Sequence, residues 1–130
     1  MYRSVLSALL LALLMTGTSQ ARDGIPSAPT NTIFSYAPLF GGPLTVRAAW
    51  SWPVKWNDDK ATTGTRYYIT ECVVRGTGEV VYLSTAPDGP ILPAIQFDVP
   101  YPATHYTFRV YAVNKWGYVS KPGKYGLYVP

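Results

Sequence analysis

The segment 104–114, which reads Thr-His-Tyr-Thr-Phe-Arg-Val-Tyr-Ala-Val-Asn, constrains the fold more than any other part of the chain. Its apolar residues stand at every second position: Tyr106, Phe108, Val110 and Ala112. A period of two places these side chains on one face of a β-strand, and Asn114 to Gly117 then predicts a turn. We expect this strand, preceded by Pro100 and Pro102, to lie at the centre of a β-sandwich.

Six further segments have the composition of strands and are separated by turn signals. They are residues 33–36, 44–52, 66–75, 79–85, 91–99 and 118–128, the last of them interrupted near Pro122. The 12 prolines and 11 glycines would interrupt long helices, whereas the 11 tyrosines favour strands. Seven short strands at this spacing predict an all-β fold, a seven-stranded antiparallel β-sandwich.

The predicted core contains Trp50, Tyr106, Phe108 and Val110 as structural residues. In segment 44–52 the alternation places Trp50 and Trp52 on one face, with Trp50 as the main core residue because a buried indole removes a large apolar area from water. Segment 66–75 is ambiguous, since neither of its faces is fully apolar. Either both faces are partly covered or a bulge shifts the register.

The first 21 residues have the layout of a secretory signal peptide. Arg3 precedes an apolar run from Val5 to Met15, and small residues up to Ala21 suggest a cleavage site. The alternative is a membrane anchor, but a run of about 11 residues is shorter than the ~20 that a spanning helix needs. We therefore expect a signal peptide at 1–21, a lead-in at 22–32 and one domain at 25–130. The protein would be secreted, periplasmic or on the cell surface, with no stable membrane insertion after cleavage.

Residue types that carry catalysis or bind metals are scarce. The sequence has one histidine, His105, expected to be exposed, and one cysteine, Cys72, expected to be a small buried residue. Asp58 and Asp59 could contribute to a calcium site, but a solvated loop is the better interpretation. The net charge of +4 comes from scattered residues, which does not indicate nucleic-acid binding. We expect no enzyme activity, no catalytic residues, no cofactor and no metal.

The segment 102–114 also resembles the fibronectin type III family, whose pattern is Pro-x-Thr-x-Tyr-x-Phe-x-Val-x-Ala-x-Asn. Gly117, Ser120 and Pro122 continue the pattern, and the segments 26–29 and 50–53 resemble it more weakly. The resemblance implies a fibronectin type III, immunoglobulin-like sandwich. It also implies that the Tyr106 hydroxyl bonds to backbone just upstream. The family's leucine six residues before that tyrosine is Pro100 here.

Three aromatic residues outside the predicted core are the candidate binding residues: Trp56, Trp116 and Tyr118. The resemblance places the loops that carry them at the same end of the sandwich. Aromatic side chains on a rigid scaffold give a large contact area at small entropic cost. We therefore expect a non-catalytic module that binds a protein partner. A carbohydrate-binding module, with these rings as a sugar platform, is the alternative. A third interpretation is that Trp56 and Trp116 fold back to cap the sandwich.

Overall fold

The computed structural model describes residues 24–130, so the predicted signal peptide at 1–21 lies outside the described residues. Seven strands and one short 3₁₀ turn follow one another along the chain. They are β1 (Thr30–Tyr36), η2 (Pro38–Phe40), β2 (Thr45–Ser51), β3 (Tyr67–Val74), β4 (Val80–Pro87), β5 (Ala94–Asp98), β6 (Thr104–Val113) and β7 (Gly123–Val129). Within residues 24–130, no helix combines the length and apolar character needed to cross a bilayer.

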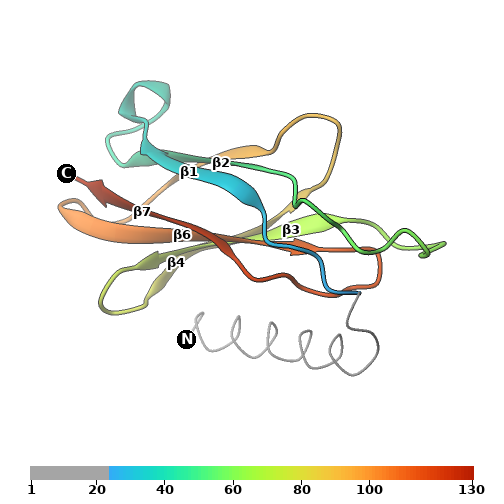
Figure 1. The fold of residues 1–130 in the computed structure, drawn as a ribbon. Helices are drawn as coiled ribbons and strands as arrows, with labels where there is room; N and C mark the ends of the chain where they lie inside the picture. Colours follow the sequence, from blue (N-terminus) through green and yellow to red (C-terminus); the bar gives the residue numbers. More distant parts are fainter. Residues whose placement is uncertain (1–23) are drawn as a thin grey trace.

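The strands form two sheets that pack face to face (Figure 1). One sheet has the order β1-β2-β5 and the other the order β4-β3-β6-β7. Every paired neighbour is antiparallel. The predicted all-β sandwich with seven antiparallel strands is therefore confirmed.

The core lies between the two sheets and is rich in aromatic rings. Trp50 is 2% exposed, and its ring lies 5.4 Å from that of Tyr68 and 5.8 Å from that of Phe108. Tyr106, Phe108 and Val110 on β6 are fully buried, as their alternating pattern predicts. The four predicted core residues therefore occupy the core.

Tyr106 on β6 stabilises the connection through which the chain crosses from one sheet to the other. The Tyr106 hydroxyl donates to the carbonyl of Tyr101 at 2.6 Å and accepts the N–H of the same residue at 2.9 Å. The structure thus contains the upstream hydrogen bond that the family resemblance implied. Val99 is buried beside exposed Pro100, and its N–H donates to the Leu44 carbonyl at 3.0 Å.

Strand β3 is buried on both faces, and it also carries a bulge. The side chains of Tyr68, Thr70, Cys72 and Val74 form one face, and those of Ile69, Glu71 and Val73 the other. On the second face, Ile69 packs with Val113 and Val119, and Glu71 accepts a hydrogen bond from Arg109 at 3.2 Å. The register with β4 shifts between Cys72 and Val73. The sequence left two interpretations open for residues 66–75, coverage of both faces or a bulge that shifts the register, and the structure contains both features.

Strand β1 begins at Thr30, inside the predicted lead-in at 22–32 and before the predicted start at residue 33. Two other strands begin later than predicted, and proline explains both. The segment predicted at 91–99 begins as a strand only at Ala94, because Pro93 has no N–H for the ladder, and Ile91 is 82% exposed. The last strand begins at Gly123, after Pro122, and Val119 forms only an isolated bridge with Val113.

Strand β2 is also shorter than predicted. It ends at Ser51, so Trp52 lies beyond the sheet and is 39% exposed. Its indole N–H donates to the Gly89 carbonyl at 3.2 Å. The predicted placement of Trp52 on the core face was therefore wrong.

Candidate functional site

Three connections leave the sheets at the same end of the sandwich. They are the β2–β3 loop (residues 52–66), the β4–β5 loop (88–93) and the β6–β7 connection (114–122), and we call this part the loop end. Figure 1 shows the β2–β3 loop and the β6–β7 connection extending past the strands in the same direction. The sequence predicted that the loops bearing the candidate aromatic residues would meet at one end, and they do.

Asn114, the first residue after β6, joins three segments of the loop end. Its side-chain amide donates to the carbonyls of Gly24 and Trp56, the latter at 2.9 Å. Its Oδ1 accepts the N–H of Trp116 at 3.0 Å and that of Tyr118 at 3.1 Å. The side chain is 1% exposed, and it uses both donors and both lone pairs. The turn that carries Trp116 is therefore held at a fixed position against the β2–β3 loop.

Asp58 makes a second connection between the same two loops. Its carboxylate accepts from Arg66 Nε at 3.0 Å, from Arg66 Nη2, and from the Lys115 N–H at 2.9 Å. The Arg66 hydrogen bond and the Lys115 N–H hold the pKa of Asp58 below its ordinary value, against the opposing effect of burial. Asp58 is 1% exposed, so the expectation of a solvated acidic loop was wrong for this residue, although Asp59 is exposed.

Gly64 allows the two loops to approach closely. Its φ of +96° lies in the left-handed region, where a side chain is strained. A Cβ at this position would also lie 2.3 Å from the Lys115 carbonyl oxygen. No other residue type fits here without displacing the backbone. Sequence reasoning placed Gly64 in a polar loop and did not identify this contact.

Trp56 caps the core instead of facing solvent. Its ring lies 5.6 Å from that of Tyr68, and the Arg66 guanidinium lies 5.0 Å above the indole. The residue is half-buried and packs against the main core cluster. Of the interpretations that the sequence left open, the structure places Trp56 in the capping role. A sugar platform that pairs Trp56 with a second exposed ring is therefore not assembled.

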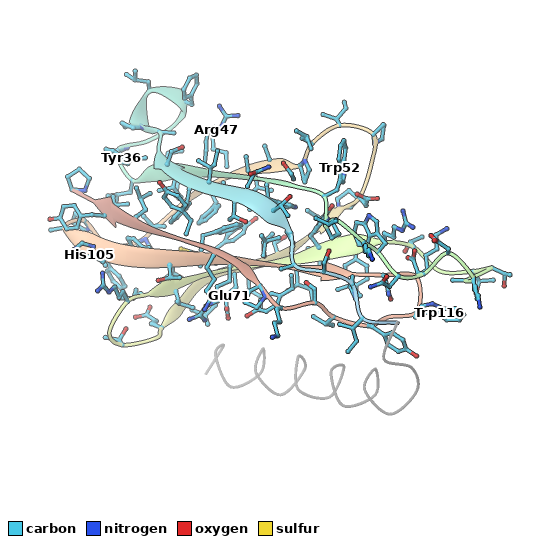
Figure 2. All side chains as sticks on the ribbon, in the orientation of Figure 1. Tyr36, Arg47, Trp52, Glu71, His105 and Trp116 are labelled. Atoms are coloured by element: carbon cyan, nitrogen blue, oxygen red, sulfur yellow. The ribbon has the colours of Figure 1, made fainter. Side chains whose placement is uncertain are left out.

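Trp116 is the candidate aromatic residue that faces solvent. It is 48% exposed, and Figure 2 shows it at the loop end, with the tip of the β2–β3 loop extending beyond it. Its backbone N–H is held by Asn114, so the exposed indole projects from a fixed turn. Exposed lysines flank the two loops at Lys55 and Lys115.

Tyr118 lies inside the domain, contrary to the expected exposure. It is 6% exposed, and its ring packs so closely on Gly24 that a Cβ there would lie 2.1 Å from a ring carbon. The burial depends on the chain before β1, which returns to cover this residue. The sequence gives no local signal of a contact between residues so far apart.

Sequence reasoning missed four other exposed apolar residues at the loop end. Trp52 is bonded to Gly89 of the β4–β5 loop, as described above. Val54, in the same loop as Trp52, is 78% exposed, and Ile91 and Leu92 in the β4–β5 loop are 82% and 50% exposed. Scattered exposed apolar residues are ordinary, but several in neighbouring loops are typical of an interaction surface. The only sequence signal was apolar character, and Trp52, Ile91 and Leu92 had been assigned to strands because of it.

The groups that could support chemistry lie apart from the loop end. His105 is exposed on β6, as predicted, and its ring lies 4.7 Å from that of Tyr128. Cys72 is fully buried, and burial raises the pKa of its thiol to about 12. In the part of the chain that the structure describes, no three His, Cys, Asp or Glu side chains come together as metal ligands.

No protein-family model matches the chain, and no curated protein matches it. Solved structures match the chain. A twitchin kinase-region structure from C. elegans, described as Fn31-NL-kin-CRD-Ig26, matches 82% of the chain at 20% identity with a TM-score of 0.59. Domains A168–A170 of titin match 81% at 20% identity with a TM-score of 0.60. The fold is that of immunoglobulin-like and fibronectin type III domains.

These likenesses show the fold alone. The chain spans 17% of the twitchin structure and 32% of the titin structure, so it corresponds to a part of each. A structure described as a myokine has a similar length, with 98% of it covered, and matches 81% of this chain at 13% identity with a TM-score of 0.54. Function depends on the sites that a fold carries, not on the fold itself.

Proposed function

We propose that this chain is a non-catalytic protein-binding module that acts outside the cytoplasm, at the cell envelope or in an extracellular assembly. The location is supported by the signal-peptide layout of residues 1–21. The binding role is supported by the loop end and by the fold, which commonly serves in protein contacts.

One observation carries the proposal: an exposed indole projects from a turn whose backbone is already fixed. Trp116 is 48% exposed. Its turn is held by three hydrogen bonds: the Asp58 carboxylate accepts the N–H of Lys115, and Asn114 Oδ1 accepts those of Trp116 and Tyr118. Tryptophan is enriched among the residues that contribute most to protein interfaces. A turn ordered before binding loses little entropy when the partner arrives.

The surroundings of Trp116 also match an interface. Trp52, Val54, Ile91 and Leu92 add apolar area at the same end. Lys55 and Lys115 supply exposed charge around it. An apolar centre with a polar rim is the usual anatomy of a protein interface.

Site-specific photo-crosslinking in the native host tests this proposal. A photoreactive phenylalanine at position 116 is expected to form an adduct with a partner protein. The same residue at position 125 is the matched control, because Tyr125 is 45% exposed but lies on β7 away from the loop end. A second measurement is affinity capture of that partner by the tagged protein without a photoreactive residue, which Trp116→Ala should abolish and Tyr125→Ala should not. Equal adducts at both positions, or capture that survives Trp116→Ala, would contradict the proposal. Recovery of the protein from the cytoplasm alone would contradict the location.

A further inference from the structure

A second surface lies at the opposite end of the sandwich, away from Trp116. A hollow of about 430 Å³ opens on the four-stranded sheet, lined among others by Arg75, His105, Thr107, Gly126 and Tyr128. Figure 2 shows His105 and Trp116 at opposite ends of the molecule. The volume falls within the range of sites for small ligands and single side chains.

The hollow exists because β7 has a glycine where a side chain would otherwise stand. Gly126 pairs with Thr107 in the β6–β7 ladder. A Cβ at Gly126 would come no closer than 3.9 Å to any other residue, the nearest atom being the Tyr106 carbonyl oxygen. Neither steric crowding nor a positive φ requires glycine here. The space is therefore one that a side chain could fill, and in this chain it is open.

The hollow has a cation at its rim. Arg75 is exposed, and its backbone N–H donates to the His105 carbonyl at 2.9 Å, which holds the Arg75 backbone at this edge. Neither of the two salt bridges found within residues 24–130 involves Arg75. Glu79, the acidic residue on the same hairpin, accepts a hydrogen bond from the Tyr101 hydroxyl at 2.9 Å. The lining contains no carboxylate, so the charge of Arg75 is not balanced inside the hollow.

The other walls supply ring surface and hydroxyl groups. The His105 and Tyr128 rings lie 4.7 Å apart and are inclined at 53°. Such a wall can pack against the methylene groups of a ligand, while Thr107 and Tyr128 offer hydroxyl donors. One guanidinium with two hydroxyls matches a singly charged carboxylate, which arginine binds through its planar fork.

We propose that this hollow binds the carboxylate of an acidic side chain presented by a protein partner. The volume exceeds what a carboxylate alone would occupy and leaves room for its methylene stem. The net charge of +4 on the chain favours approach of an acidic segment. None of the residues used here belongs to the loop end, so the two binding surfaces can be tested separately.

Two-dimensional NMR of the isotope-labelled protein provides the test, with N-acetyl-glutamate methylamide as the probe. The amides of residues 105–107 and 126–128 are expected to shift saturably with a Kd in the millimolar range. N-acetyl-glutamine methylamide, the neutral analogue of the same shape, should leave them unchanged.

Three variants locate the binding. Arg75→Gln should weaken it about tenfold. Gly126→Leu should fill the hollow and abolish the shifts, and Gly126→Ala, whose Cβ has room, serves if the leucine variant does not fold. Lys124→Gln is the control, because Lys124 is an exposed cation on the same strand outside the lining. The affinity of the Lys124→Gln variant for the glutamate probe should stay close to that of the unaltered protein.

Several results would overturn the inference. They are an equal response to the glutamine probe, no shifts up to about 50 mM probe, or equal weakening by Lys124→Gln and Arg75→Gln. Tighter binding of inorganic phosphate at the same amides would replace the carboxylate by a phosphate ligand.

Discussion

Removing the hydroxyl of Tyr106 should lower stability more than removing any exposed tyrosine hydroxyl. In Tyr106→Phe the ring keeps its place in the core, but the Tyr101 N–H and carbonyl lose the group that satisfied both. These backbone groups lie where the chain crosses between the sheets. No other partner for either is found in residues 24–130.

The expected magnitude follows from those two bonds. Each contributes about 1 kcal/mol net, and an unsatisfied buried group costs about 1–3 kcal/mol. Tyr101 is 41% exposed, so water can reach part of the released backbone and relieve some of the loss. We expect the free energy of unfolding to fall by about 2 kcal/mol, which lowers the Tm of a domain of about 100 residues by roughly 8–12 °C.

Urea unfolding followed by fluorescence of the four tryptophans, of which Trp50 is fully buried, measures this change. Tyr125→Phe is the matched control, because it removes the hydroxyl of a half-exposed tyrosine and should alter stability by less than about 0.5 kcal/mol. If Tyr106→Phe changes stability no more than Tyr125→Phe does, the hydroxyl does not secure the crossing and the reasoning is wrong.

Four further substitutions probe the loop end, each by thermal or urea unfolding. Asp58→Asn should cost about 1–3 kcal/mol at neutral pH, because it leaves Arg66 without its counter-charge in a partly buried place. The lowered pKa of Asp58 means that its contribution is present above the unfolded pKa and is lost as pH falls through the folded value. The variant should therefore lose less stability between pH 5 and pH 2 than the unaltered protein, and an equal loss would argue against this pair. Trp56→Ala should cost about 2–4 kcal/mol as a capping residue, whereas Trp116→Ala should cost less than about 0.5 kcal/mol; the reverse order would refute the two assignments. Gly64→Ala should cost more than about 1 kcal/mol because of its positive φ and the close carbonyl of the β6–β7 turn, and a neutral result would show that the two loops are not held together.

The sequence predicted most of the sandwich because its signals are local. Alternation along β6 identified Tyr106, Phe108 and Val110 as one buried face without any knowledge of the neighbouring strands. Prolines explain where this reasoning failed, since apolar residues such as Ile91 continue the pattern beyond the point where Pro93 ends the hydrogen-bond ladder.

The loop end was less predictable because contacts between distant residues define it. Asp58 looked like a solvated acid, and its burial depends on Arg66 and on a backbone N–H of another loop. Tyr118 and Trp116 have similar local sequence surroundings, yet one is covered by the chain around Gly24 and the other is not. Residue type cannot distinguish an aromatic residue that caps a core from one that meets a partner.

The buried thiol of Cys72 on β3 can report how often the protein unfolds. Cys72 is the single cysteine of the sequence and is fully buried, so an alkylating reagent can reach it only when β3 opens. At a stability of about 5 kcal/mol, roughly one molecule in several thousand is open at any moment. The rate of alkylation, followed by mass spectrometry, therefore measures the open fraction. The measurement needs no purified sample and no added fluorophore. Because the sequence has no second cysteine, no intrachain disulfide competes with alkylation of this thiol.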